Sequence, residues 1–453
     1  MSEGLELASR ALRAAAGDEV LAVVRTERSG LARFAGSEVH QPTLIENEVV
    51  ELQTMRDSRL GIASTNRTDD EGLRALAARA AEAAESAPQD RDFAGLAPPA
   101  QPPAVKGYDE ETATLAAEDQ ARLAAAAIEA SDFELYGFFT SGETELALAS
   151  STGLAVAQQM TDVSVLALAA VDGASGYAEQ TGWRLGDVDP AAAATEATEK
   201  AKRTRGAVML EPGSYAAVLE PPAFAELLAY FSWDAFGGLG LIEERSYAFD
   251  KLGRHVFDEQ FSLADDALDP RGLPKAFDFE GTPKQLVQLV REGVLENVVW
   301  DRASAKRAGG GRETTGHAPP SSLRHYGPFT YSLSVAGGDA ASTEELAERV
   351  GDGIYVTRLH YLSVVDPREG IVTGMTRDGT FRIRGGKIAD PLVNLRFTVR
   401  VPELLAQLHG LTREPVLVNQ DSYYDERYPT GLLSPAVGTA RFDVTGVGSE
   451  PGV

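Results

Sequence analysis

Six histidines are the side chains best suited to bind a metal or move protons in this chain, and their spacing matches no local metal motif. They are His40, His255, His317, His325, His360 and His409. A helical zinc site places two imidazoles on one helix face, usually at positions i and i+4, with a carboxylate beside them as the base. No HxxxH, HxH or HExxH pattern occurs, and the chain has no cysteine. A metal site is therefore not expected, except one assembled from residues far apart in the sequence.

A glycine- and proline-rich loop at 309–327 holds the densest group of polar side chains. Long loops of this composition often carry function or move. One interpretation is a loop that binds the carboxylate or the backbone of a peptide. Its substrate-binding candidates are then Arg312, His317, Arg324 and His325. The other interpretation is a solvent-exposed loop whose histidines are incidental.

Phosphate-binding and serine-nucleophile motifs are not found. The glycine tracts GGGR and GGK match neither GxxxxGK[ST] nor a strand–GxGxxG–helix context. The segment Gly385–Lys387 instead predicts a hairpin turn between two strands. There is no GxSxG elbow, and a serine triad built from distant residues stays open.

The composition excludes several classes of protein. The formal net charge is −26, from 42 basic and 68 acidic residues. A field of this sign repels nucleic acids and anionic membranes, and it tolerates or attracts basic peptides. No apolar run approaches the ~20 residues that span a bilayer, and the N-terminus lacks the pattern of a signal peptide. We therefore expect a cytoplasmic protein that binds neither nucleic acid nor membrane.

The helices and strands expected from the sequence, which must position these residues, indicate an α+β fold. In the first half, strands and Ala-rich helices flank a proline-rich linker at 93–105, where four prolines disfavour regular structure. The second half is rich in strands and glycine, with a helix near 221–238. We divide the chain into an N-terminal α+β domain, 1–215, and a β-rich C-terminal domain, 216–453.

Six segments follow one another between Arg33 and Phe397. They are RFAGSEVHQ, DSRLGIASTNRTDDEGLRALAARAAEAA, SSTGLAV, LEPGSYAAVLEPPAFAELL, FDFEGTPKQLVQLVREGVLENVVWDRASAKRAGGGRETTGHA and TGMTRDGTFRIRGGKIADPLVNLRF. In content and order they resemble the TldD/PmbA (TldE) family of metallopeptidase-like proteins, once described as modulators of DNA gyrase. The remaining statements about function come from this resemblance.

In the active TldD branch of the family, the central helix carries H-E-x-x-x-H, and a late cysteine helps to hold the metal. By resemblance, this motif falls on Ala225, Glu226 and Tyr230. Alanine has no donor atom, a neutral tyrosine is a poor zinc ligand, and one glutamate holds neither zinc nor an activated water. The resemblance therefore implies the TldE/PmbA branch, with a degenerate metallopeptidase helix and no metal or confident catalytic residue in this chain.

The resemblance implies a non-catalytic, TldE-like subunit of a zinc metallopeptidase complex that degrades or processes unfolded or modified peptides. Zinc is then expected in a TldD-like partner, within a heterodimer or larger complex, and no cofactor is expected in this chain. Peptides are expected to dock by addition to a sheet edge, with weak sequence preference.

Two alternatives stay open. The first is an active hydrolase or homodimer with a relocated metal site, for which Glu226, Glu243, Glu244, His255 and His317 are the residues to mutate. Stoichiometric metal in the purified chain alone favours it. The second is a peptide-binding regulatory protein without a peptidase partner.

Overall fold

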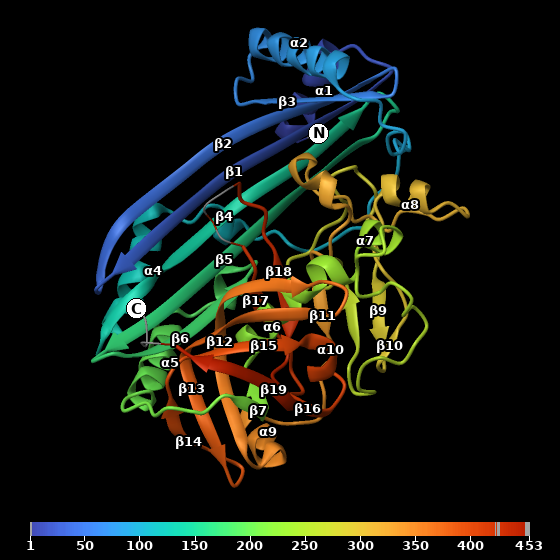
Figure 1. Ribbon diagram of the computed structural model, residues 1–453. Coiled ribbons are helices and arrows are strands. Elements are labelled where there is room, and N and C mark those ends of the chain that lie inside the picture. The colour runs from blue at the N-terminus through green and yellow to red at the C-terminus, as the bar shows by residue number, and fades with distance from the viewer. Residues whose placement is uncertain (1, 422, 424–425, 449–453) are drawn as a thin grey trace.

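The computed structural model describes residues 2–421, 423 and 426–448. These residues form three β-sheets and several α-helices, as Figure 1 shows. Runs of antiparallel strands with helices packed beside them replace alternating βαβ units, so the predicted α+β class is confirmed. No helix in the described part of the chain is both long and apolar enough to cross a membrane.

The first sheet is an antiparallel meander of long strands that arches across one side of the molecule (Figure 1). In spatial order its strands are β3 (Arg59–Thr65), β2 (Glu38–Arg56), β1 (Glu19–Ala35), β4 (Glu134–Ser150), β5 (Ala155–Val171) and β6 (Ala174–Gly182). The pairing of β1 with β4 joins segments on either side of the proline-rich linker. The linker, 93–105, has neither helix nor strand, as its prolines predict.

Helices cover one face of this sheet. They are α1 (Glu3–Ala14), α2 (Asp70–Ser86), α3 (Glu110–Ala113), α4 (Ala117–Glu129) and α5 (Pro190–Arg203). Helices α1 and α2 share a hydrophobic core with one end of the sheet, and α4 and α5 share another with its far end. The opposite face of the sheet packs against the C-terminal half through Leu21, Leu148 and Phe277. The sheet therefore separates a helical layer from the rest of the molecule.

Two glycines let helices pack directly on strand backbone. A Cβ at Gly61 of β3 would lie 2.0 Å from the carbonyl oxygen of Ala80 in α2. One at Gly176 of β6 would lie 2.2 Å from that of Ala197 in α5. Both distances are far shorter than van der Waals contact, so any larger residue would push its helix away from the sheet.

A closed ring of five strands forms the centre of the C-terminal half. Its strands are β7 (Gly213–Leu219), β12 (Gly353–Asp366), β13 (Ile371–Arg384), β15 (Leu395–Arg400) and β19 (Val437–Val447). Hydrogen bonds run from β7 through β12, β13, β15 and β19 back to β7, so the ring has no free edge. Two strands extend it, β14 (Lys387–Leu392) and β16 (Leu408–Leu411). Gly385 and Gly386 form the predicted turn between β13 and β14, with φ of 54° and 78°.

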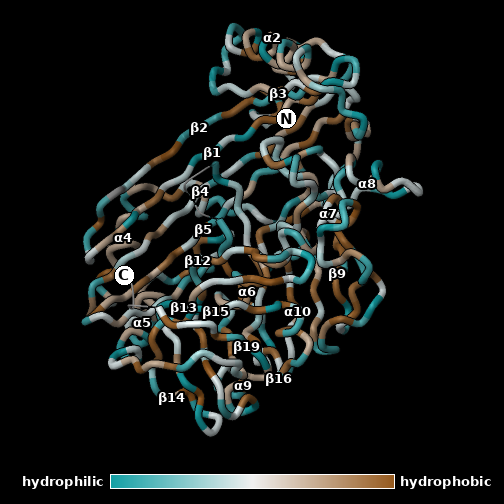
Figure 2. The backbone as a smooth tube through the Cα atoms, in the orientation of Figure 1, coloured by the Kyte–Doolittle hydropathy of each residue, from teal (hydrophilic) through white to brown (hydrophobic). Residues whose placement is uncertain are grey.

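A further sheet shares its core with the ring and with α6 (Pro221–Ala235). In order its strands are β10 (Val294–Leu295), β9 (Val287–Arg291), β8 (Leu263–Asp265), β11 (Leu333–Val335), β18 (Gly431–Ser434) and β17 (Val416–Asn419). Figure 2 shows hydrophobic segments, in brown, in the strands around α6. Shorter helices complete this half, namely α7 (Gly238–Ile242), α8 (Arg302–Ala308), α9 (Thr343–Val350) and α10 (Val401–Leu404).

A buried ion pair joins the late part of the chain to the N-terminal sheet. Arg427 is buried against β4 and β5, and two of its nitrogens lie 2.7 Å from the two carboxylate oxygens of Asp162. Its remaining nitrogen donates to Thr140 Oγ1 at 3.0 Å. The guanidinium also lies 4.7 Å from the ring centroid of Tyr423. The region beyond Leu411 thus holds the two halves of the protein together.

The boundary between the two predicted domains stays a proposal. The strand β7 spans 213–219, so the division at 215/216 falls inside it. β7 pairs with β12 and β19 of the C-terminal ring. We propose that the boundary lies in the connection between Arg203 and Gly213.

Candidate functional site

The helix α6 carries Ala225, Glu226 and Tyr230, the positions to which the resemblance assigns the metallopeptidase motif. Pro221 and Pro222 occupy its first turn, where proline breaks no helical hydrogen bond. Ala225 is completely buried in the core. Glu226 is largely buried and Tyr230 is exposed, and helical geometry puts these two side chains on one face.

The Glu226 carboxyl belongs to a charged cluster between the two halves of the protein. Burial raises the pKa of Glu226 to about 7, the positive charge of Arg358 opposes the rise, and the negative charge of Glu179 adds to it. Burial also raises the pKa of Glu179 to about 7, although the Tyr177 hydroxyl donates a hydrogen bond of 2.8 Å to that carboxyl. Both carboxyls therefore change charge near neutral pH.

Arg358 of β12 supplies the positive charge of this cluster. Its Nε lies 3.0 Å from Asp378 Oδ2, and its guanidinium lies 4.2 Å from the ring centroid of Tyr177. Burial and the positive charges of Arg377 and Arg358 lower the pKa of His360 to about 4, so this histidine is neutral at pH 7. The positive charge of Arg358 therefore offsets only part of the effect that burial has on the pKa values of Glu226 and Glu179.

The residues at the motif positions do not fit a zinc ion. Ala225 offers no donor atom, and burial and the charge of Glu226 raise the pKa of Tyr230, so its hydroxyl stays protonated at neutral pH. Among residues 2–421, 423 and 426–448, no three His, Cys, Asp or Glu side chains form a group that could hold a metal. The functional group that this helix offers is therefore the carboxyl of Glu226, under the influence of the positive charge of Arg358.

His317 lies in the core, although the sequence suggests an exposed loop. Its Nε2 lies 3.1 Å from Asp265 Oδ1, and the side chain is completely buried. Its Nδ1 lies 2.9 Å from Thr315 Oγ1. Burial and the positive charge of Lys284 lower the pKa of His317. This histidine attaches its loop to β8 and has no exposed surface to offer a substrate.

The structure does not bring the other three loop candidates together with His317. Arg312 is exposed and its guanidinium lies 4.5 Å from the ring centroid of Trp300. Arg324 donates to Asp90 at 2.9 Å. His325 is exposed and lines the same shallow surface pocket as Arg324. The assignment of Arg312, Arg324 and His325 to substrate binding stays a prediction.

Two of the residues suggested for a relocated metal site, Glu243 and His317, have other partners, and no metal-binding group of His, Cys, Asp or Glu occurs among the described residues. Glu243 accepts hydrogen bonds from Arg245 at 3.0 Å and from Arg307 at 2.9 Å. These two arginines lower the pKa of the Glu243 carboxyl. His317 is paired with Asp265 in the core, as described above. The geometry therefore gives no support to a metal site built from this set.

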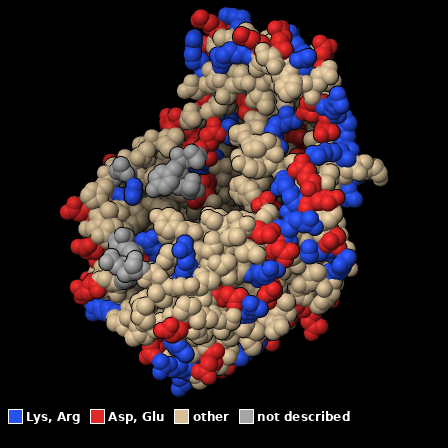
Figure 3. Space-filling model, viewed as in Figure 1, with Lys and Arg blue, Asp and Glu red and all other residues tan. Residues whose placement is uncertain are grey.

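A cleft of about 550 Å³ lies between the N-terminal sheet and the loop that leads into the short 3-10 helix η2 (Ser321–Tyr326). Arg25, Glu51 and Gln53 line it from the sheet, and Leu323 lines it from η2. Ser321 donates to Glu51 across one end at 2.6 Å. Figure 3 shows this side of the molecule, hollowed between the arch of the sheet and the lower half.

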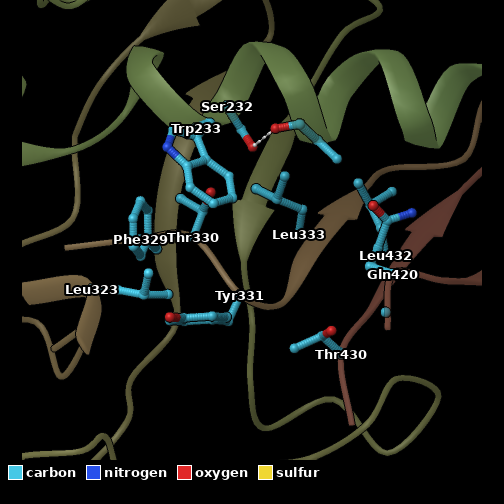
Figure 4. A pocket seen from close by; sticks show the side chains of 12 residues that line it. Ser232, Trp233, Leu323, Phe329, Thr330, Tyr331, Leu333, Gln420, Thr430 and Leu432 are labelled. Carbon is cyan, nitrogen blue, oxygen red and sulfur yellow. Dashed lines mark hydrogen bonds between the residues drawn. The ribbon is translucent and has the colours of Figure 1, made fainter. Parts of the chain in front are cut away.

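Leu323 also lines a second cavity beside α6, which we call the α6 cavity (Figure 4). Ala229, Ser232 and Trp233 of α6 form one wall, and Phe329 belongs to the facing segment. Residues 226, 229 and 233 of a helix lie on one face. The cavity therefore opens beside the cleft and on the same face of α6 as Glu226.

Three family models match this chain. They describe PmbA/TldA metallopeptidase domain 1 at residues 22–84, the central domain at 102–205, and the C-terminal domain at 212–446. The third match alone covers more than half of the chain. The chain therefore belongs to the PmbA/TldA metallopeptidase family, and the resemblance stated from its sequence is confirmed.

Solved structures share its fold along almost the whole length. TldE from Thermococcus kodakarensis superimposes with a TM-score of 0.84 at 20% identity, covering 97% of this chain and 99% of that one. A protein described as a modulator of DNA gyrase from Thermotoga maritima superimposes with a TM-score of 0.81 at 18% identity, covering 94% and 96%. At these identities the likeness shows the fold alone.

Two curated relatives match over shorter stretches. An uncharacterized protein of Methanocaldococcus jannaschii is 32% identical over 173 residues, which are 38% of this chain. A protein named Metalloprotease from Methanothermobacter thermautotrophicus is 27% identical over 222 residues, which are 47% of this chain. The chain spans 40% and 46% of the lengths of these relatives.

Sequence reasoning missed most of the residues that surround Glu226 and the α6 cavity. Glu179 and Arg358 stand on strands far apart in the chain, so no spacing connects them with Glu226. Trp233 lies on α6, whereas Phe329 and Tyr331 lie together in the irregular segment before β11, about a hundred residues later in the chain. A partial signal existed for Trp233, because a tryptophan seven residues after Glu226 lies on the same helix face.

Proposed function

We propose that this chain is the non-catalytic, TldE-like subunit of a zinc metallopeptidase complex whose TldD-like partner holds the metal. The supporting observation is the surroundings of α6, where a buried methyl group and an exposed tyrosine stand at the positions of the two histidines. The remaining glutamate faces the charge of an arginine. The substrates of the complex are unfolded or modified peptides.

Arg358 has a specific part in this proposal. In a metalloprotease of this type the motif glutamate is the base for a zinc-bound water. Here the guanidinium of Arg358 contributes a permanent positive charge beside Glu226 and Glu179, within a cluster that contains no metal-ligand set. The helix keeps its place in the core while its carboxyl serves the packing of the two halves.

The cleft gives this subunit a part in holding substrate. Its wall carries the polar side chains of Arg25, Glu51 and Gln53. Arg25 is paired with Glu426, and Glu51 accepts hydrogen bonds from Gln53 and Ser321. The amides of a peptide backbone that binds here therefore replace some of these contacts. We propose that peptides lie in this cleft on their way to the partner's zinc.

The test is reconstitution with a TldD-like chain from the same host. We expect no stoichiometric zinc in this chain alone, and we expect zinc and cleavage of an unfolded peptide in the mixture. The decisive pair of variants replaces the motif glutamate in each chain by glutamine. Glu226→Gln leaves cleavage by the mixture within about twofold, whereas the same change in the HExxxH motif of the partner abolishes it.

Two results contradict the proposal. About one zinc per chain in the isolated protein, removed by Glu226→Gln, would mean that this chain holds its own catalytic metal. Cleavage by the partner at full rate without this chain would mean that it is not a subunit of the active enzyme.

A further inference from the structure

The α6 cavity lies next to the cleft, so one bound molecule can contact both. Ala229 and Trp233 lie three and seven residues after Glu226, which is about 5 and 10 Å along the helix axis. Leu323 stands at the boundary, since it lines both the cavity and the cleft. The cavity and the cleft therefore adjoin at Leu323.

Three of the twelve lining residues are aromatic, namely Trp233, Phe329 and Tyr331 (Figure 4). The Trp233 ring centroid lies 4.7 Å from that of Phe329, and Phe329 lies 5.9 Å from Tyr331. Figure 4 shows Trp233 and Phe329 side by side, with Tyr331 across the base and Leu333 behind. Half of the Trp233 surface, 50%, is exposed. An exposed tryptophan over an apolar hollow is typical of a binding site.

Ser232 and Gln420 have partners inside the protein, whereas Thr330 Oγ1 and Tyr331 Oη are buried hydroxyls without a hydrogen-bond partner among the described residues. Ser232 Oγ donates to the Ala229 carbonyl at 3.0 Å, which Figure 4 marks with a dashed line. The backbone N–H of Gln420 donates to the Thr430 carbonyl at 2.9 Å, and its side-chain amide donates to the Asn419 carbonyl at 3.0 Å. None of the twelve residues that line the cavity carries a formal charge. The cavity therefore suits a largely apolar group, and Thr330 Oγ1 and Tyr331 Oη are the polar atoms that such a group meets.

The size of the cavity limits what can enter it. Its volume is about 260 Å³, whereas sites for drug-sized ligands usually have about 300–1,000 Å³. One large side chain fits, and a helix or a folded surface does not. The neighbouring cleft, with about 550 Å³ and polar side chains on its wall, provides room for the backbone that would carry such a side chain.

We propose that the α6 cavity is a specificity pocket that takes one large apolar side chain, aromatic by preference, from an extended peptide bound in the cleft. The proposal rests on the proposed function, because it gives this subunit a peptide to hold. Through this pocket the non-catalytic chain selects which part of a peptide is held near the catalytic partner. The aromatic preference follows from the edge and face contacts that Trp233 and Phe329 can make with an incoming ring.

The test uses a host peptide of serine and alanine with a single central residue that is alanine, phenylalanine or aspartate. Binding to the intact isolated chain is measured by calorimetry. Burial of one aromatic side chain predicts that the phenylalanine peptide binds about 10- to 100-fold more tightly than the alanine peptide. The aspartate peptide binds no more tightly than the alanine peptide.

A pair of matched variants separates the cavity from general peptide binding. Ala229→Leu adds a side chain to the cavity wall and abolishes the preference for phenylalanine over alanine. Ala192→Leu makes the same substitution at an exposed position of α5 and preserves the preference. Equal preference in the two variants overturns the proposal, and so does equal binding of the phenylalanine and alanine peptides to the wild-type chain.

The outcome can be told apart from failure of the proposed function. If the isolated chain binds neither peptide, the same comparison is made on kcat/KM for cleavage by the reconstituted complex, and equal values for the two peptides overturn the pocket. Zinc-dependent cleavage without a phenylalanine preference keeps the subunit role and removes the pocket. A preference in the isolated chain without any cleavage in the mixture supports the pocket and removes the subunit role.

Discussion

The ion pair between Arg427 and Asp162 gives the most demanding prediction. Both side chains are almost completely buried, at 3% and 0% exposure. Replacing Arg427 by alanine leaves the Asp162 carboxylate in the core without its bidentate partner, and it removes the donor to Thr140. Breaking such a buried pair on one side costs about 3–5 kcal/mol. We therefore expect Arg427→Ala to destabilise the contact between the two halves by about this amount.

Urea unfolding followed by tryptophan fluorescence measures the effect as a shift of the transition midpoint. Because the chain has several domains, limited proteolysis of the region after Leu411 provides a second readout. The control is Arg384→Ala, which removes an exposed partner of Asp390 at 3.1 Å. An exposed pair of this kind contributes about 0–1 kcal/mol.

A double-variant cycle distinguishes a pairwise contact from general damage. If the pair is the cause, Arg427→Met together with Asp162→Leu costs less than the sum of the two single changes, by at least about 1 kcal/mol. The reasoning is refuted if the two changes add, or if Arg427→Ala shifts the midpoint no more than Arg384→Ala does.

Three further predictions follow from other parts of the molecule. Gly61→Ala destabilises the protein by about 1–3 kcal/mol, because the added methyl would meet the backbone of α2, whereas Gly186→Ala, with open space around it, is nearly neutral in thermal unfolding. The pKa of Glu226 is raised to about 7 in the folded protein, against an ordinary 4.5, so between these pH values the folded state holds a proton that the unfolded state has released. The contribution of this protonated carboxyl to the free energy of unfolding is therefore complete below pH 4.5 and is lost as the pH rises to about 7. In the wild-type protein we expect the free energy of unfolding to fall by at most about 3 kcal/mol between pH 4.5 and 7 because of Glu226, and in Glu226→Gln we expect this fall to be absent. Equal pH profiles of unfolding for the wild type and the variant would contradict this. Replacing Ala225 and Tyr230 together by histidine does not create a zinc site at one metal per chain, because the buried position 225 has no room for an imidazole, and elemental analysis of the purified variant checks it.

Local patterns predicted much of the fold. The helix α5 begins and ends where Pro190 and the basic last turn indicate, and α6 begins at its two prolines. The Ala-rich stretch after the linker forms two helices, α3 and α4, separated by a turn at Thr114. Such patterns act over a few residues, which is why boundaries of this kind can be read from one sequence.

The candidate site was less accessible to the same reasoning. Position 226 could be found because a family motif aligns with it, but its partners Glu179 and Arg358 are brought near by the packing of β6 against the C-terminal half. His317 differs from Glu226 because its surroundings, and not its partners, were unexpected. Its loop is rich in glycine and proline and suggested an exposed side chain, whereas the contact with Asp265 holds the imidazole in the core. Side-chain burial inside a loop depends on tertiary contacts that no local pattern encodes.

The ring of strands has a consequence for how the protein is made. The six strands of the N-terminal sheet have all been synthesised by Gly182, so this sheet can form early on the ribosome. By contrast, β7 ends at Leu219 and waits for β12 and for β19, which begins at Val437. At ~5–20 residues per second, that interval lasts roughly 10 to 40 seconds. During this time the apolar strand β7 and the helix after it lack their final partners, so shielding by chaperones matters most for the C-terminal half of the nascent chain.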